Sequence, residues 1–361
     1  MVTTILARYF ASRFLFSSFV IFAGIFTLII TVDYIELMRR AASVASVSGL
    51  FVAQTALFRV PLALEKLMPF CILIGAMSCF LVFSRRLEFV VARASGISAW
   101  QFITPALLCA LALGVLATTV YNPVSADLQE RSKGMETKIF AGGSASGSDG
   151  ANFWINQVTD DGQTIVSAAR SQEQGQLLTG VTVFRFDPSG SFKERIEAQE
   201  ATLEPGRWVF KKVRRYGLDS PLAEDAYTLQ TTLTTAQVRG SFSTPETVPF
   251  WQLPDYIKSS EKSGQATAGY RLQYHKLLAR PFLLAAMVLL AAAVSLRFFR
   301  FGGVQKMVLS GVAAGFLLYV LSKVTEDLSK AELLHPLAAA WLPVCVGGLS
   351  GFLALLYQED G

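Results

Sequence analysis

Six long apolar stretches constrain the fold of this 361-residue chain more than any other feature. A helix needs about 20 mostly apolar residues to cross the roughly 30 Å hydrocarbon core of a bilayer. Three stretches precede a polar middle segment and three follow it, and they are Phe14 to about Ile35, Leu67–Ser84, Ile97–Tyr121, Pro281–Leu296, Met307–Ser322 and Leu333–Tyr357. The pattern predicts an α-helical membrane protein with six transmembrane helices and one inserted domain. We expect Asn122-Pro123 to end the third helix, because proline interrupts helices.

The distribution of charge supports this class and argues against a nucleic-acid-binding protein. Charged residues make up 16% of the chain, against about 25% in soluble domains. Residues 122–272 contain 16 Lys+Arg and 18 Asp+Glu, a net charge of −2, and the rest contains 16 Lys+Arg and 9 Asp+Glu, a net charge of +7. The positive excess therefore lies beside the apolar stretches, where it orients helices in a membrane.

Basic residues near the span ends predict the topology. With the N-terminus inside, the inner face receives Arg8, Arg13, Arg85, Arg86, Arg93, Arg297, Arg300 and Lys306. The outer short connections receive Arg39, Arg40, Arg59, Lys66, Lys323 and Lys330. This bias predicts that both termini are cytoplasmic and that the polar insert faces outward.

The polar insert has the pattern of a β-rich domain. Short runs with branched and aromatic residues are separated by turn residues, and they are Phe153–Val158, Thr164–Ala168, Val181–Phe186, Phe192–Leu203, Arg207–Tyr216 and 227–235. Regular spacing of this kind favours a sandwich or a barrel. Trp208 and Phe210 share one strand face at period two, so we expect both to be inside. The predicted organisation is 1–121 with three helices, 122–272 with the β-domain, and 273–361 with three helices.

The chain lacks the residue patterns of a self-sufficient enzyme. No Gly-x-x-x-x-Gly-Lys-Ser/Thr motif is present, and the two histidines, His275 and His335, lie at span entrances. We therefore expect no catalytic site, no cofactor and no metal site in this chain.

An amphipathic segment lies between the second and third spans. Leu87, Val90, Val91 and Ala94 recur at helical spacing, while Glu88 and Arg93 lie off that face, and Gly96 follows as a helix terminator. One interpretation is an interfacial helix that only joins two spans. The other is a coupling helix that presents an apolar stripe and a carboxylate to a soluble partner.

The outer end of the first span carries a second candidate site. Arg39 and Arg40 follow Asp33 and Glu36 at helical spacing. The segment is either a solvated turn with weak ion pairs or an anion site, since guanidinium groups bind phosphate oxygens in pairs.

Several motifs resemble one family. Arg86-Leu87-Glu88-Phe89-Val90-Val91-Ala92-Arg93-Ala94-Ser95-Gly96 resembles the cytoplasmic coupling helix (about 86–96) of the lipopolysaccharide export permeases, the LptF/LptG family. Ala7-Arg8-Tyr9, the arrangement of three spans, insert and three spans, and the segment Leu333–Pro343 are similar as well. Within the family, Phe316–Leu321 and the Trp-Leu-Pro ending resemble the LptG branch more.

The resemblance implies a fold, a location and a set of partners. The inserted domain would be a periplasmic β-jellyroll, and the chain would be a multi-pass protein of the inner membrane of a Gram-negative bacterium. It would work beside a homologous permease subunit as a heterodimer, on a cytoplasmic ATPase dimer. It would take lipopolysaccharide from the membrane lipid and pass it to a single-span periplasmic bridge protein.

The resemblance also implies roles for particular residues. Glu88 matches the acidic coupling-helix residue that pairs with the ATPase, with Leu87, Val90, Val91, Arg93 and Ala94 around it. Arg39 and Arg40 match basic residues near the lipid phosphates. Below them, the inner faces of spans one and five offer Phe26, Leu28, Phe316 and Tyr319 as candidates for the lining of an acyl cavity.

Two alternatives remain at this point. A membrane-anchored periplasmic sensor or scaffold would also combine spans with an outer β-domain, although six spans exceed what anchoring needs. A secondary transporter usually carries ionisable residues near the midplane of the membrane, whereas Asp and Glu here lie toward the span ends.

Overall fold

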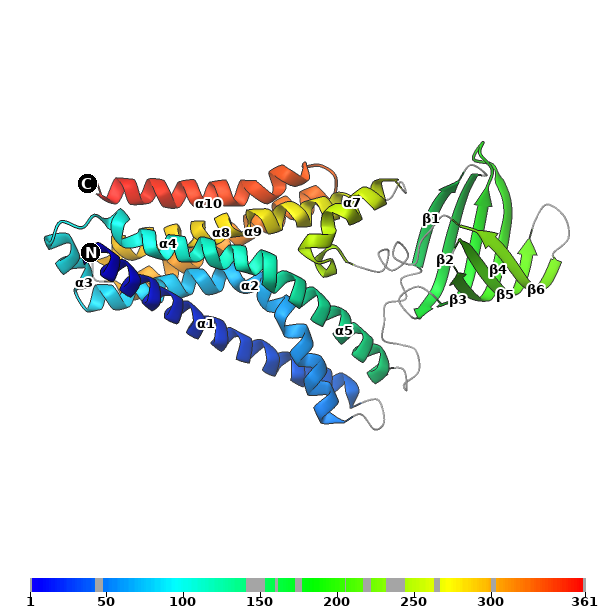
Figure 1. Cartoon of the computed structure of the whole chain (residues 1–361), viewed down its shortest axis with the longest axis horizontal. Coiled ribbons are helices and arrows are strands. Elements are labelled where there is room, and N and C mark those ends of the chain that lie inside the picture. The colour runs from blue at the N-terminus through cyan, green and yellow to red at the C-terminus, as the bar shows by residue number, and fades with distance from the viewer. Residues whose placement is uncertain are drawn as a thin grey trace. The chain divides into compact units, whose positions relative to one another are not determined.

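The computed structural model describes residues 2–42, 48–140, 153–159, 162–172, 177–204, 206–216, 222–231, 244–262, 267–299 and 303–359 (Figure 1). The chain forms two compact units. The helical unit contains Met1–Gly143, Pro249–Trp251 and Ala268–Gly361, and the β unit contains Ser144–Val248 and Gln252–Thr267.

Among the residues that the structure describes, six helices are long and apolar enough to cross a membrane, which confirms the predicted helix number and class. Five of them are single helices, which are α1 (Val2–Ala41), α2 (Gly49–Arg85), α8 (Ala268–Phe299), α9 (Val304–Lys330) and α10 (Pro336–Glu359). The third in chain order is composite and contains α4 (Ala99–Leu116), the π-helical turn η1 (Ala117–Tyr121) and α5 (Asn122–Phe140). The helices α1, α2 and the composite helix extend well beyond the predicted apolar stretches.

The expectation that Asn122-Pro123 ends the third helix was wrong. Proline has no N–H for the carbonyl four residues earlier, which here belongs to Thr119. The indole Nε1 of Trp251 donates to that oxygen at 3.1 Å, and the widened turn η1 gives the proline ring room. The helix therefore continues, and residues 122–140 belong to the helical unit rather than to the β unit.

Small residues bring the helices into close contact. A Cβ atom on Gly75 of α2 would lie 2.7 Å from the Cα of Ser18 in α1, and one on Gly114 of α4 would lie 2.3 Å from the Cα of Pro281 in α8. Gly311 and Gly315 of α9 face side chains of α2 at similarly short distances. These two glycines thus allow α9 to pack closely against α2 within one chain.

The β unit contains one antiparallel sheet whose strand order follows the chain. The strands are β1 (Phe153–Thr159), β2 (Gly162–Gln172), β3 (Leu177–Phe186), β4 (Phe192–Glu204), β5 (Arg207–Tyr216) and β6 (Leu222–Gln230). Each described strand pairs with the next one, for example Val183 with Ile196 and Trp208 with Leu229. Part of the predicted 227–235 strand, residues 232–235, lies outside the described residues. After the sheet, two short 3-10 turns, η3 (Pro245–Thr247) and η4 (Phe250–Gln252), lead to α7 (Leu253–Lys262).

One row of residues that runs across the strands lacks backbone pairing, and the sheet bends around its core at this row. Gly180 in β3 and Lys212 in β5 have positive φ angles of 63° and 51°, and the ladders omit the pairs at this row. Buried positions in β5 consequently shift from Phe210 to Val213, with two exposed lysines between them. Local kinks of this kind curve a sheet, and the strands are visibly curved (Figure 1).

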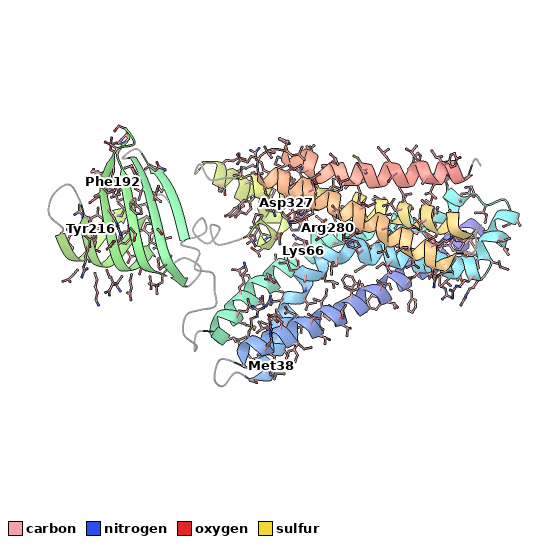
Figure 2. The ribbon with its side chains drawn as sticks, turned by 180° about the vertical axis from the view of Figure 1, so that it is seen from behind. Met38, Lys66, Phe192, Tyr216, Arg280 and Asp327 are labelled. Carbon is pink, nitrogen blue, oxygen red and sulfur yellow. The ribbon has the colours of Figure 1, made fainter. Side chains whose placement is uncertain are left out.

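The predicted phase of the β5 strand is confirmed. Trp208 and Phe210 are both fully buried, and Val209 between them is partly exposed. They join the inward side chains of the neighbouring strands, which are Val166, Ala168, Leu178, Val181, Val183, Ile196, Ala198, Ala201, Leu203, Val213 and Leu229. Phe192 and Tyr216 lie on the outside (Figure 2).

A buried ionic cluster occupies one end of the inner face. Glu194 in β4 accepts hydrogen bonds from Arg185 Nη1 at 2.6 Å and from Arg215 Nη2 at 2.8 Å. Burial by itself raises the pKa of the Glu194 carboxyl, but the hydrogen bonds and charges of Arg215 and Arg185 outweigh it and hold this pKa below its ordinary value. The ionised carboxylate is therefore favoured in the folded state.

The stability of the β unit should accordingly fall in acid. The unfolded glutamate has a pKa of about 4.3, so the contribution of Glu194 is complete above that pH and is lost as the pH falls through its lower folded-state pKa. Glu194→Gln should cost about 2–3 kcal/mol at pH 7, since Arg185 loses its carboxylate partner and Arg215 keeps only the longer contact with Glu224, at 3.3 Å. It should also flatten the pH profile below pH about 5. Denaturant unfolding followed by Trp208 fluorescence, with the other tryptophans replaced by phenylalanine, measures both effects.

The matched control for this prediction lies on the same strand. Glu200→Gln changes an exposed glutamate whose nearest oxygen lies 3.9 Å from Lys211 Nζ, and exposed pairs contribute about 0–1 kcal/mol. Equal losses in the two variants would contradict the assignment of acid sensitivity to the buried cluster.

Candidate functional site

The segment between the second and third spans is a short helix, α3 (Glu88–Ala94). Leu87 begins the turn into it with a φ of 58°. The helix ends at a glycine in the left-handed region, Gly96, and the amide of Ile97 donates to the carbonyl of Ala92 at 3.0 Å. This closing pattern is a Schellman motif, which fixes the end of the helix.

The apolar residues of this segment divide into an inner and an outer face. Phe89 and Ala92 are buried against the helical unit. Val90 and Val91 are 46% and 67% exposed, and Leu87 and Ala94 are exposed as well. The predicted stripe is thus an uncovered apolar surface in the isolated chain. The side chain of Arg93 lies outside the described residues.

Glu88 connects α3 with the first helix. Its Oε1 accepts a hydrogen bond from the hydroxyl of Tyr9 at 3.3 Å, and the guanidinium of Arg13 lies 5.5 Å from the centre of the Tyr9 ring. The carboxylate is partly exposed. It is therefore oriented by its own chain and still accessible to a cation.

An aromatic cluster fixes α3 to the ends of three long helices. The ring centre of Phe89 lies 4.0 Å from that of Phe102 in α4, and Phe102 lies 4.0 Å from Phe10 in α1. Phe83 in α2 completes the cluster at 5.1 Å from Phe10. All four rings are buried. These buried contacts join α3 directly to α2 and α4, and to α1 through Phe102.

The predicted cations at the far end of α1 are paired within the same helix. Arg39 Nη2 lies 2.8 Å from Glu36 Oε2, and Arg40 Nε lies 3.1 Å from Glu36 Oε1. Both arginines are exposed, and Met38 marks this end of α1 (Figure 2). Exposed pairs of this type are weak, so an anion with several oxygens can compete for the guanidinium groups.

The structure adds Arg59 of α2 to this region. Arg59 Nη1 lies 2.6 Å from Glu136 Oε1 in α5, and its Nη2 lies 3.6 Å from Asp33 Oδ1 in α1. Three long helices thereby meet at one guanidinium. Sequence reasoning placed Arg59 only among the outer basic residues, because its two carboxylate partners lie 26 and 77 positions away.

The four candidate lining residues lie on two helices that flank α2. Phe26 is partly exposed and Leu28 is exposed on α1, which contacts α2 through Ser17 Oγ and the carbonyl of Gly75 at 2.9 Å. Phe316 and Tyr319 are exposed on α9. The Tyr319 ring lies 5.6 Å from that of Phe70 in α2. Two helices that pack on α2 thus each carry exposed apolar residues, as expected of surfaces that meet lipid or a partner helix.

A buried carboxylate that sequence reasoning missed lies in the middle of α2. Glu65 Oε1 is 2.6 Å from Arg280 Nη1 in α8, and it also accepts from Asn122 Nδ2 at 2.9 Å. Its Oε2 accepts from Ser125 Oγ at 2.5 Å. In the sequence, Glu65 lies just before the predicted span that begins at Leu67, and Arg280 lies just before the one that begins at Pro281. Two opposite charges at equivalent ends of two spans were the one sequence signal that could have suggested this ion pair.

Over the described part of the chain, these features define a membrane protein of six spanning helices with an inserted β-domain and a short helix between its second and third spans. The model of the family "Lipopolysaccharide export system permease LptF/LptG" matches residues 8–357, and this chain belongs to that family. It is 22% identical over 324 residues to the lipopolysaccharide export system permease protein LptG of Escherichia coli (strain K12), covering 86% of this chain and 87% of the relative. It is 21% identical over 303 residues to LptG of Haemophilus influenzae (strain ATCC 51907 / DSM 11121 / KW20 / Rd), covering 79% of each chain.

Proposed function

We propose that this chain is a permease subunit of an ATP-driven transporter that extracts lipopolysaccharide from the inner membrane and passes it to a periplasmic bridge protein. It would pair with a homologous permease subunit, and a cytoplasmic ATPase dimer would hydrolyse the ATP. The observation that carries the proposal is the uncovered apolar stripe on α3, which is held to α1, α2 and α4 by buried aromatic rings. A docking helix fixed in this way passes a displacement to the spans.

The mechanism is mechanical. A basic residue of the ATPase pairs with Glu88, and Leu87, Val90, Val91 and Ala94 fill an apolar recess on the partner, with Arg93 at its edge. When ATP binding moves this contact, α1 moves with α3, because Tyr9 donates to Glu88 and because Phe10 packs on Phe102, which in turn contacts Phe89. Movement of α1 relative to α9 then changes the width of the space on either side of α2. Lipid is displaced from that space toward the inserted domain.

The proposed orientation places α3 and both termini in the cytoplasm and the β unit in the periplasm. Within the helical unit, the labelled N- and C-terminal ends lie at the same end as α3 (Figure 1). Arg8, Arg13, Arg85 and Arg86 belong to this end, and the predicted positive-inside bias supports its cytoplasmic location.

The lipid site is proposed at the outer end of α1. Lipopolysaccharide presents phosphates at the membrane surface and acyl chains below it. Arg39 and Arg40 would bind the phosphates after leaving Glu36, and Phe26 and Leu28 with the exposed α9 residues Phe316 and Tyr319 would contact the chains. Because the ion pairs of Arg39 and Arg40 with Glu36 are weak and exposed, replacing them with contacts to phosphate costs little free energy.

Reversal of both arginines tests this site. Arg39→Glu with Arg40→Glu should reduce lipopolysaccharide capture by a photocrosslinker at position 35 several-fold, because each charge beside an anionic surface contributes roughly 1 kcal/mol. Assembly with the partner subunits should be unchanged, which gel filtration of the complex measures. Lys330→Glu, at the outer end of α9, serves as the control for charge alone. Equal capture by the double variant and the unmodified chain would show that the phosphates bind elsewhere.

A further inference from the structure

Two backbone carbonyls in the spanning helices lose their usual donor to a proline. In an α-helix each amide donates to the carbonyl four residues earlier, and proline has no amide hydrogen. Pro281 lies inside α8 and Pro343 lies inside α10, so the affected carbonyls are those of Leu277 and Ala339. Both of these residues are buried. Because the hydrocarbon core of a membrane holds no water, each carbonyl needs a replacement donor from the protein.

A threonine of a neighbouring element supplies each replacement donor. Thr118 in the π-helical turn η1 donates through Oγ1 to the carbonyl of Leu277 at 2.9 Å. Thr325 in α9 donates through Oγ1 to the carbonyl of Ala339 at 3.0 Å, and it shares this hydroxyl with the carbonyl of Ser322 in its own helix, at 3.1 Å. Both threonines are only 4% exposed. The two hydrogen bonds thus join η1 to α8 and α9 to α10 through buried polar atoms.

A third proline of the helical unit has the same kind of partner. Pro123 leaves the carbonyl of Thr119 without its helical donor, and the indole of Trp251, which also belongs to the helical unit, donates to that oxygen. Each of the three donors comes from a segment other than the one that contains the proline. The replacement of proline-deprived hydrogen bonds is therefore a property of how the helices pack, rather than of any single helix.

Small residues allow the joined elements to approach one another at these places. Gly114 of α4 lies one turn before Thr118 and faces the backbone of Pro281 in α8. A Cβ atom on Gly351 of α10 would lie 3.0 Å from the backbone N atom of Leu290, also in α8. The helix α8 is thus in close backbone contact with both α4 and α10, and α10 is in turn hydrogen-bonded to α9.

We propose that Thr118 and Thr325 are positioning residues that replace the hydrogen bonds removed by Pro281 and Pro343 and so hold η1, α8, α9 and α10 together as one body. Each bond exists only while its two elements stay in contact. Separation of η1 from α8, or of α9 from α10, leaves a buried carbonyl without a donor, which is costly where water is absent. A rearrangement of the helical unit should therefore move these four elements together.

A double-mutant cycle on the full-length protein in lipid nanodiscs tests each bond. Thr118→Val removes the hydroxyl but keeps the branched shape, and it should lower the thermal unfolding midpoint by about 2–4 °C. In a Pro281→Ala background, residue 281 regains an amide that can donate to Leu277, so the same substitution should lower the midpoint by less than about half as much. Thr325→Val with and without Pro343→Ala should follow the same pattern with smaller losses, because its hydroxyl is shared between two carbonyls.

Spin labels on α10 measure the helix geometry at one proline directly. Leu337 and Leu353 are exposed on either side of Pro343, and 16 residues of straight helix span about 24 Å. With the four native cysteines replaced, the distance distribution between labels at 337 and 353 should broaden in Thr325→Val. It should stay narrow in Thr325→Ser, which keeps the hydroxyl, and it should narrow again when Pro343→Ala is added to Thr325→Val.

The matched control removes a hydroxyl that serves no proline. Thr31 of α1 is exposed and donates to the carbonyl of Thr27 in its own helix at 2.7 Å, so Thr31→Val should shift the midpoint by no more than about 1 °C. Equal losses for Thr118→Val with and without Pro281→Ala would show that this hydroxyl does not replace the missing helical bond, and would overturn the proposal for α8. An unchanged distance distribution in Thr325→Val would overturn it for α10.

Discussion

Glu88→Lys is expected to weaken strongly the coupling between the chain and the proposed ATPase partner. The substitution turns the proposed ion pair into a contact between like charges, and breaking such a pair on one side costs about 2–5 kcal/mol, which is more than tenfold in affinity. It also replaces the acceptor of the Tyr9 hydroxyl with a donor. Co-purification of the ATPase, together with lipid-stimulated hydrolysis, measures the loss.

Three related variants separate the causes. Glu88→Gln keeps an acceptor for Tyr9 but removes the charge, so it should weaken coupling less than lysine does. Tyr9→Phe keeps the ring and its packing beside Phe83 but removes the hydroxyl, so it should preserve assembly and loosen only the orientation of Glu88. Val91→Asp places a charge on the exposed stripe and should weaken docking. If both Glu88→Lys and Val91→Asp assembled and transported normally, this result would contradict the coupling role and show that α3 only connects two spans.

Gly114→Ala is expected to have the largest effect on the stability of the helical unit. The added Cβ would lie 2.3 Å from the Cα and 3.0 Å from the N atom of Pro281, so the backbones of α4 and α8 must separate. One turn further, Thr118 Oγ1 donates to the carbonyl of Leu277 at 2.9 Å, and separation weakens this bond as well. Overpacking of this kind costs about 1–3 kcal/mol or more, which should lower the thermal midpoint by several degrees.

The control for this prediction is another helical glycine. A Cβ on Gly24 of α1 meets no atom within 4 Å, so Gly24→Ala should change stability by no more than about 1 kcal/mol, in the favourable direction set by helix propensity. Thermal unfolding of both variants in the same detergent gives the comparison. A normal midpoint for Gly114→Ala would show that α4 and α8 are not in close contact at this point.

The fold class was predictable because its determinants are local in sequence. Each span is a long apolar run, and each strand is a short run with branched or aromatic residues between turn residues. Period-two alternation placed Trp208 and Phe210 inside. The transverse bend was not predictable, because it lies where several ladders lose a pair at the same row, and the positive φ of Lys212 goes against the ordinary preference of a lysine.

The continuation of the third helix shows where local rules fail. A proline usually ends a helix, yet at Pro123 the indole of Trp251 supplies the missing donor to the Thr119 carbonyl. Trp251 belongs to a segment that follows the β strands in the sequence. No pattern around residue 123 reveals a partner that lies 128 positions later in the chain. Tertiary contacts therefore decide whether this proline ends the helix.

The candidate sites were predictable to different degrees. The α3 stripe could be read from spacing alone, and its uncovered state follows because Phe89 and Ala92 face inward. The ion pairs of Glu36 with Arg39 and Arg40 followed from helical spacing as well. The contacts of Arg59 and Glu65 join helices distant in sequence, so only the packed structure brings them together.

Reconstitution tests the central proposal most directly. The chain is placed in proteoliposomes with its homologous permease subunit, the ATPase and lipopolysaccharide, and transfer to a soluble form of the bridge protein is measured with and without ATP. We predict ATP-dependent transfer that is lost when this chain is omitted and strongly reduced with Glu88→Lys. A complex that assembles and hydrolyses ATP but transfers no lipopolysaccharide above the ATP-free level would contradict the proposed function.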